Sequence, residues 1–189
     1  MDRPPIRGDE VRQGKFIYLD AVSDAVRDTL GDDPLPESLL YQLVEDDRPI
    51  APMTARQVYQ TYKDAGELGF ALRLSTDKTC IGFCRLGHVS WQARQAQLMV
   101  ALVREDCLTL ELLADVIQTV LQFAYWEANL NRVYADCSAD HTLMQAALVQ
   151  AGFTHEGCLR QEVYRDGRYL DKCVYSILAR EWLSRDQDD

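Results

Sequence analysis

Hydrophobic and polar positions along the chain change their spacing several times, and this predicts alternating strands and helices. Alternating or continuous short apolar runs are typical of strands. Apolar residues three and four positions apart are typical of a helix with one buried face. We therefore predict strands over residues 13–19, 69–74, 80–86, 95–103, 131–137, 153–163 and 171–178. Helices are predicted over residues 21–30, from residue 54 onward, over 108–128 and over 140–151.

Three element boundaries have a local chemical reason. Thr54 is suited to cap the helix that follows it, and Gly152 is suited to the left-handed end of a helix. Asp166-Gly167 lies at the centre of residues 165–168 and predicts a hairpin turn. The order of elements predicts an α/β fold, with a mixed central sheet of about six or seven strands flanked by helices.

Composition narrows the class of protein. A chain of 189 residues, 47% hydrophobic and 26% charged, suits one soluble domain over residues 1–189, with frayed ends at 1–10 and 184–189. No apolar run approaches the ~20 residues of a membrane span, and the first residues lack the features of a signal peptide. We therefore expect a cytoplasmic protein with no membrane partner. A net charge of −10 argues against nucleic acid as a partner, because phosphates are neutralised by Lys and Arg.

The cysteines are scattered and mostly have apolar neighbours, so we expect small buried side chains rather than a disulfide framework. One spacing deserves comparison with a zinc site: Cys137-x3-His141 followed by His155-x2-Cys158. Neither half matches a familiar zinc knuckle, and both cysteines lie in predicted strands. We therefore favour core cysteines and expect no metal. The six are Cys80, Cys84, Cys107, Cys137, Cys158 and Cys173.

The most specific pattern lies near the C-terminus. It comprises Leu130-Asn131-Arg132-Val133, residues 151–157 (AGFTHEG), residues 159–171 (LRQEVYRDGRYLD), residues 175–178 (YSIL) and Glu181-Trp182. With the order of elements, it resembles the GNAT superfamily of acyl-CoA N-acyltransferases. It looks most like the branch that acetylates ribosomal-protein N-termini and amino sugars. The resemblance is dense from about residue 130 to 183 and looser from 11 to 129.

The resemblance implies how acetyl-CoA would bind. In the family the coenzyme lies in a V-shaped opening between the central parallel strands. The strand before the long helix offers backbone groups to the pantetheine arm, and the next loop cradles the pyrophosphate beside the helix N-terminus. Carried over to this chain, the coenzyme-binding residues are Leu102, Val103, Arg104, Thr109, Leu113, Ala114 and His141.

The segment Cys107–Leu113 departs from the family pattern in this region. It contains no glycine, and Glu111 would place a negative charge near the pyrophosphate. The alternative is that this segment is only an added first turn of a packed helix. His141 and Met144 occupy places where the family often has Asn and Ser. His141 could contact the coenzyme, or it could be a cap or surface residue.

Candidates for proton transfer lie in the strand over residues 153–163 and just after it. The resemblance implies a carboxylate facing the substrate there, which assigns Glu162 as the base and Tyr164 as an acid or orienting group. Gln161 is the neighbour of Glu162 in this strand, and Tyr134, in the strand over residues 131–137, is a further candidate for the acid or orienting role. The alternative is that these are ordinary residues of a half-exposed strand.

The predicted function is transfer of an acetyl group from acetyl-CoA to a primary amine, on a small molecule or a peptide N-terminus, by direct attack. One alternative is a GNAT-fold module that has lost acetyl-CoA binding and acts as an interaction or regulatory domain. Another is the same fold with a different ligand. Exposed sheet edges would also allow a homodimer.

Overall fold

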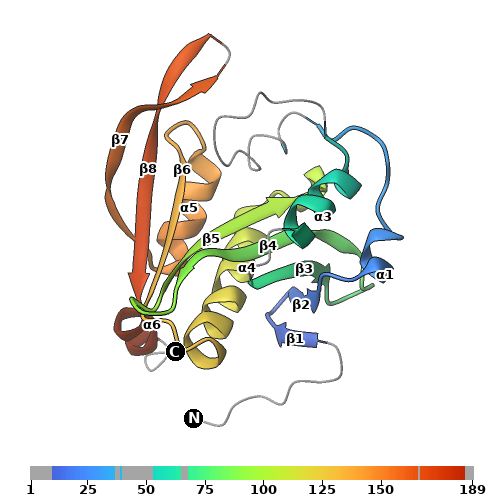
Figure 1. The fold of residues 1–189 in the computed structure, drawn as a ribbon, viewed down its shortest axis with the longest axis horizontal. Helices are drawn as coiled ribbons and strands as arrows, with labels where there is room; N and C mark the ends of the chain where they lie inside the picture. The colour runs from blue at the N-terminus through green and yellow to red at the C-terminus, as the bar shows by residue number, and fades with distance from the viewer. Residues whose placement is uncertain (1–9, 37–38, 40–52, 65–67, 166, 186–189) are drawn as a thin grey trace.

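The computed structural model describes residues 10–36, 39, 53–64, 68–165 and 167–185 (Figure 1). Its described residues form one eight-stranded sheet in the order β1-β2-β3-β4-β5-β6-β8-β7. Every neighbouring pair is antiparallel except β5 and β6, which are parallel. The strands are β1 Glu10–Gln13, β2 Ile17–Ala21, β3 Leu68–Leu74, β4 Cys80–Ser90, β5 Gln95–Leu102, β6 Arg132–Ser138, β7 Thr154–Arg165 and β8 Arg168–Leu178.

Helices cover both faces of this sheet. They are α1 Asp24–Arg27, α3 Ala55–Asp64, α4 Leu110–Gln122, α5 Thr142–Ala151 and α6 Ala179–Arg185. Alternate strand residues point to opposite faces, so Val100 packs in the core that α4 and α5 cover, while Ala101 packs in the core under α1 and α3. In the second core Tyr59 of α3 meets Phe83 of β4 with ring centroids 6.0 Å apart. The α/β prediction is confirmed.

The predicted first strand is instead a pair of strands, so the sheet has eight strands rather than six or seven. A turn over residues 14–16 separates β1 from β2. The Asp115 carboxylate of α4 accepts hydrogen bonds from the backbone N–H groups of Lys15 (2.8 Å), Phe16 (2.7 Å) and Ile17 (3.1 Å). Charge-assisted bonds to three successive amides hold this turn in place.

The predicted boundaries at Thr54 and Gly152 are confirmed. The Thr54 hydroxyl accepts the Gln57 N–H at 3.2 Å, and the Gln57 side chain accepts the Thr54 N–H at 2.8 Å, which is a capping box. Gly152 ends α5 with φ of 100°. The predicted hairpin is present, since Arg165 pairs with Arg168; Asp166 lies outside the described residues.

Two predicted helices differ in extent. Only Asp24–Arg27 of residues 21–30 is α-helical. After it, the backbone N–H groups of Thr29 and Leu30 donate to carbonyls three residues earlier. The predicted helix 108–128 begins at Leu110, after Thr109 caps it, and its last turn, Phe123–Glu127, is a π-helix. Among the described helices, none is long and apolar enough to cross a membrane.

The ends and the cysteines also refine the predictions. Residues 1–9 and 186–189 lie outside the described residues, whereas Glu10 belongs to β1 and residues 184–185 to α6. Four cysteines are buried as predicted, but Cys137 is half-buried and Cys158 is exposed. Cys158 is exposed because it lies on β7, an edge strand of the sheet.

The close approach of β4 to β5 can be tested at Gly82 of β4. A Cβ at this position would lie 2.2 Å from the Ala101 carbonyl oxygen and 2.8 Å from the Leu102 Cα. Because both atoms belong to backbone, Gly82→Ala is expected to lower the free energy of unfolding by about 1–3 kcal/mol. Urea denaturation measures this. Gly31→Ala is the control, since its Cβ would meet nothing closer than 4.0 Å, and an equal loss in both variants would contradict the account.

Candidate functional site

The two parallel strands at the centre of the sheet separate part-way along their length. β5 and β6 pair only from Gln95 with Arg132 to Gln97 with Tyr134. Beyond that point β5 stays paired with β4 as far as Leu102, and β6 stays paired with β8 as far as Ser138. We call the region bounded by residues 98–102 and 135–138 the β5–β6 split. Figure 1 shows the two arrows heading apart, so the split faces the carboxyl ends of both strands, where α/β proteins commonly bind ligands.

A polar network crosses the sheet where the pairing ends. Gln97 is only 7% exposed. Its Nε2 donates to Asp136 Oδ1 at 3.0 Å, and its Oε1 lies 2.6 Å from His88 Nδ1. On the far side Lys172 Nζ is 3.7 Å from Asp136 Oδ2. The network therefore links β4, β5, β6 and β8 at the base of the split.

The network also determines which tautomer neutral His88 adopts. A carboxylate only accepts hydrogen bonds, so Asp136 requires the NH2 group of Gln97 to face it. The Gln97 oxygen then faces His88 and accepts a hydrogen bond from Nδ1–H. In neutral His88 this leaves Nε2 as the acceptor nitrogen.

The loop between β5 and α4 presents a helix N-terminus. Thr109 accepts the Leu112 N–H at 3.3 Å, and the Thr109 N–H donates to Cys107 O at 2.9 Å. The first four amides of a helix have no intrahelical acceptor, so the N–H groups of Leu110 and Glu111 stay available to a ligand. They carry the positive end of the helix dipole.

The predicted coenzyme-binding residues other than His141 lie in this loop or next to it. They differ in which of their groups a ligand could contact. Leu102 ends β5 with a buried side chain, and Val103 follows it. Leu113 and Ala114 are buried in α4, and the Leu113 N–H donates to Thr109 O at 3.0 Å. Their side chains therefore pack in the core. The Arg104 guanidinium donates hydrogen bonds to the Asp106 carboxylate, which raise the pKa of Arg104, so a phosphate would compete with this ion pair.

His141 lies apart from that loop, at the start of α5. It occupies the N-cap position but makes no side-chain capping bond. Desolvation and the nearby Arg165 cation lower the pKa of His141 below its ordinary value of 6.5, and Asp140 opposes this shift. The imidazole is therefore neutral at physiological pH.

The predicted catalytic pair lies on the outer hairpin. β6 ends where Ser138 aligns with Lys172, while Tyr164 pairs with Tyr169, which lies three positions before Lys172, toward the start of β8. Tyr164 is 65% exposed and its ring lies 4.9 Å from that of Tyr169. Glu162 is exposed in the irregular stretch between residues 159 and 163. The structure therefore places both residues beyond the end of β6.

A cavity of about 550 Å³ is lined by Arg160, Gln161 and Asp171, and Glu162 follows Gln161 in the sequence. The Gln161 N–H donates to Asp171 Oδ1 at 2.9 Å and stabilises this irregular stretch. The volume is within the range of small-molecule sites. This cavity is on the hairpin rather than at the base of the split.

Sequence reasoning missed His88, Gln97 and Asp136. Gln97 gave a signal, because it interrupts an otherwise apolar buried strand, and a buried amide needs partners. The identity of those partners follows only from strand pairing.

The chain has clear relatives. Residues 35–154 match the family described as Acetyltransferase (GNAT) domain. The uncharacterized N-acetyltransferase p20 of Bacillus licheniformis is 28% identical over 142 residues, covering 70% of this chain and 79% of that protein. The putative ribosomal N-acetyltransferase YdaF of Bacillus subtilis is 33% identical over 63 residues, covering 33% of this chain and 34% of YdaF. The ribosomal branch is thus supported only loosely.

Solved structures share the fold. An acetyltransferase (GNAT family) from Bacillus anthracis superposes with a TM-score of 0.72 at 14% identity, covering 90% of this chain and 99% of that one. Spermidine N-acetyltransferase from Vibrio cholerae, in complex with CoA and spermine, gives 0.70 at 18% identity, covering 88% and 98%. At these identities the likeness shows the fold alone, and it confirms the predicted fold.

The lowered pKa of His141 can be tested, because it makes the stability of the folded protein depend on pH. As the pH falls through 6.5, the unfolded chain binds a proton at His141 that the folded protein binds only at lower pH. The wild type is therefore expected to lose more stability below pH 6.5 than His141→Asn does. Urea midpoints of both proteins above and below that pH measure the difference. Parallel pH curves for the two proteins would rule out a lowered pKa.

Proposed function

The chain belongs to the acetyltransferase (GNAT) family, since residues 35–154 match that domain, and we propose that it transfers an acetyl group from acetyl-CoA to a primary amine. The observation that carries this proposal is the β5–β6 split. Beyond Gln97 and Tyr134 the facing edges of the two strands have no pairing with each other. Amide groups on such an edge suit an extended ligand that itself contains amides, as the pantetheine arm does.

The residues around the split fit this coenzyme in part. We propose that Leu102 offers backbone groups to the pantetheine arm and that Val103 offers its carbonyl, because the Val103 N–H already donates to Ile81 O at 2.9 Å. We also propose that His141 contacts the coenzyme from α5. The pyrophosphate would lie at the start of α4, near Arg104 and Thr109, with Leu113 and Ala114 packing behind. The amides of Leu110 and Glu111 supply the hydrogen-bond donors.

Bound acetyl-CoA supplies a thioester carbonyl that a neutral amine attacks, releasing the coenzyme thiol. The protein must then remove the proton that the amine loses. His88 is placed for this role, because the Gln97–Asp136 bond holds its Nδ1 as the donor and its Nε2 as the acceptor. An imidazole is also the side chain best suited to exchange protons near neutral pH.

Glu162 and Tyr164 are the second candidates for proton transfer. They lie beyond the end of β6 on the hairpin, whereas the network lies at the base of the split. The hairpin position suits contact with the acceptor amine, since Gln161, the residue before Glu162, lines a cavity together with Arg160 and Asp171. We therefore place the base in the network and the acceptor at the hairpin.

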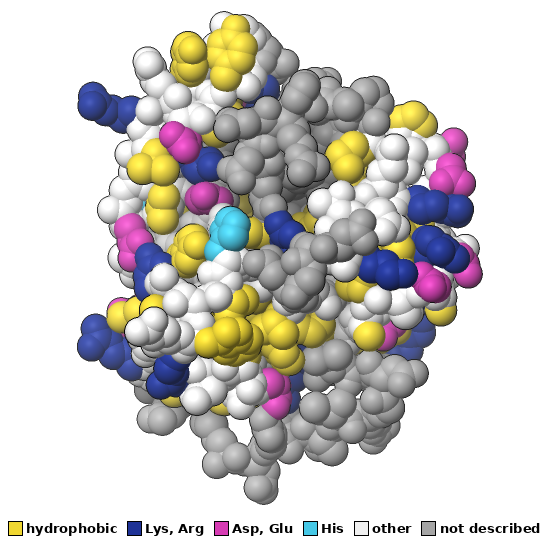
Figure 2. Space-filling view, viewed as in Figure 1, with side chains coloured by type: hydrophobic (Ala, Val, Ile, Leu, Met, Phe, Trp, Pro, Cys, Tyr) yellow, Lys and Arg dark blue, Asp and Glu magenta, His cyan; other side chains and the backbone are white. Residues whose placement is uncertain are grey.

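The acceptor that fits best is a cationic primary amine, either a small polyamine-like molecule or a peptide N-terminus. A net charge of −10 attracts cations by long-range electrostatics. Figure 2 shows acidic and basic side chains interspersed on one face, so this attraction comes from the whole charge rather than from one patch there. The structural neighbour from Vibrio cholerae contains spermine.

The second candidate function is an interaction module that has lost the coenzyme. The loop between β5 and α4 favours it, because no glycine opens its backbone and because Leu112 and Leu113, at the start of α4, are buried. The homodimer, through edge strands such as β7, and the cytoplasmic location also stay predictions.

Glu111 tests the coenzyme site. Its carboxylate stands in the first turn of α4, beside the donor amides. Glu111→Gln is expected to tighten acetyl-CoA binding about fivefold, since the repulsion it removes is on the order of 1 kcal/mol. Isothermal titration calorimetry measures both affinities, with Asp33→Asn as a control for charge alone. No heat of binding at millimolar acetyl-CoA in any of the three proteins would support the interaction module instead.

His88 tests the proton acceptor. His88→Asn keeps a group able to bond Gln97 but removes the second ring nitrogen, so kcat/KM is expected to fall about 100-fold. Glu162→Gln and Tyr164→Phe are expected to change KM for the amine more than kcat. Thiol release with a panel of primary amines provides the assay. If the hairpin variants lose kcat while His88→Asn keeps it, the base lies on the hairpin.

A further inference from the structure

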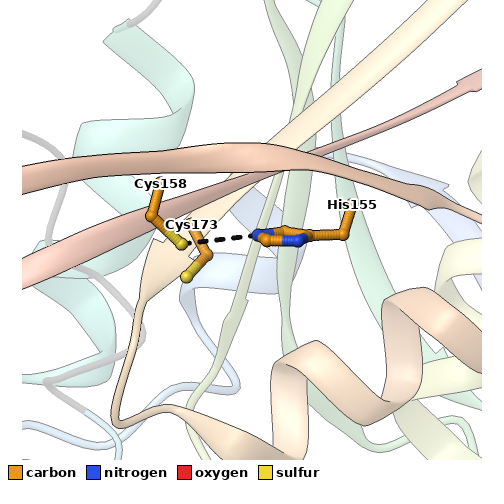
Figure 3. A group of neighbouring side chains, drawn as sticks. All are labelled: His155, Cys158 and Cys173. Carbon is orange, nitrogen blue, oxygen red and sulfur yellow. Dashed lines mark hydrogen bonds between the residues drawn. The ribbon is translucent and has the colours of Figure 1, made fainter.

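The outer part of the sheet brings together three side chains of the kind that bind soft metal ions. His155, Cys158 and Cys173 each place one ligand atom within 4.8 Å of the others. Figure 3 shows the imidazole pointing toward the two thiols, with its Nε2 3.4 Å from Cys158 Sγ. From the sequence we expected no metal. The set of possible zinc ligands considered there contained Cys137 and His141 instead of Cys173.

An irregularity in β7 creates this group. Residues three apart on a regular strand point to opposite faces, so His155 and Cys158 would be separated by the sheet. In β7 the register shifts between His155 and Gly157: His155 pairs with Tyr175, and Cys158 pairs with Cys173. Tyr175 and Cys173 are two apart on β8 and share a face, so their partners share it too.

Gly157 makes the irregularity possible. Its φ of +150° is one that residues with a side chain rarely adopt. Its Cα is otherwise open, since an added Cβ would meet nothing within 4 Å. The glycine is therefore required for backbone conformation rather than for close packing.

Two of the three ligand groups are held in place before any ion binds. Cys173 is 6% exposed and fixed in the core. The His155 ring packs on the Tyr175 ring with centroids 4.9 Å apart, and the Tyr175 hydroxyl lies 3.1 Å from Gln145 Oε1 of α5. Held ligands lose little freedom on binding, which favours affinity.

The spacing suits a tetrahedral ion. With Zn–N of about 2.1 Å and Zn–S of about 2.3 Å, a tetrahedral angle places the nitrogen and sulfur about 3.6 Å apart. The 3.4 Å between His155 Nε2 and Cys158 Sγ is close to this value. Two thiols and one imidazole select zinc-like ions over magnesium or calcium, which prefer oxygen ligands.

We propose that His155, Cys158 and Cys173 bind one zinc-like divalent ion, whose fourth ligand is water. The exposure of His155 and Cys158 gives the ion a path of entry. The ion joins β7 to β8 at the base of the hairpin that carries Glu162 and Tyr164. It thereby stabilises an edge strand and the position of the hairpin.

Cobalt(II) provides the direct test, because tetrahedral thiolate-bound cobalt has strong visible and charge-transfer absorption. The purified protein, with its thiols kept reduced, is titrated with cobalt(II) and then with zinc(II). We expect saturation at one equivalent, displacement of the cobalt bands by zinc, and a rise in melting temperature with zinc.

Ligand variants decide whether the proposed residues hold the ion. Cys158→Ser and His155→Gln are expected to weaken cobalt binding by more than about tenfold. Cys80→Ser, which removes a buried thiol from β4, is the matched control and should bind as the wild type does. Circular dichroism checks that each variant is folded. The proposal is overturned if the wild type gives no thiolate charge-transfer band, or if Cys158→Ser leaves the band unchanged.

Discussion

The separation of β5 from β6 determines where the middle of the sheet exposes unpaired backbone and which side chains meet there. Each strand is held by its outer neighbour, β5 by β4 as far as Leu102 and β6 by β8 as far as Ser138. The two pair with each other over only three positions. The sheet is thus two antiparallel halves joined along a short parallel seam, and the split exposes backbone edges in the middle of the fold. Gly82 belongs to the same arrangement, because its lack of a side chain lets β4 stay against the end of β5.

The network at the seam relates this architecture to chemistry. A buried Gln97 needs partners on both sides, and it finds one in each half of the sheet: His88 on β4 and Asp136 on β6. The same bonds that satisfy the amide hold the imidazole in one tautomer. On the outer half, the register shift in β7 similarly aligns His155 with Cys158 and Cys173. In both places a departure from regular strand pairing determines which side chains meet.

Local patterns predicted most of the elements, and distant contacts explain what they missed. The capping box at Thr54 and the left-handed Gly152 depend on residues close in sequence, so both could be read directly. The turn between β1 and β2 depends on Asp115, which is 100 residues from Lys15. Gln97 and Asp136 are 39 residues apart. Such partners are determined by topology and register, which a single sequence specifies only through the whole fold.

If the β5–β6 split and the start of α4 form an acetyl-CoA site, bound coenzyme covers their backbone amides, and amide hydrogen exchange detects this protection. Exchange is measured by mass spectrometry with and without acetyl-CoA. We expect bound acetyl-CoA to slow exchange in residues 98–102 and at Leu110 and Glu111, with little change in β1 and β2. Unchanged exchange at saturating coenzyme, or protection confined to other elements, would contradict it.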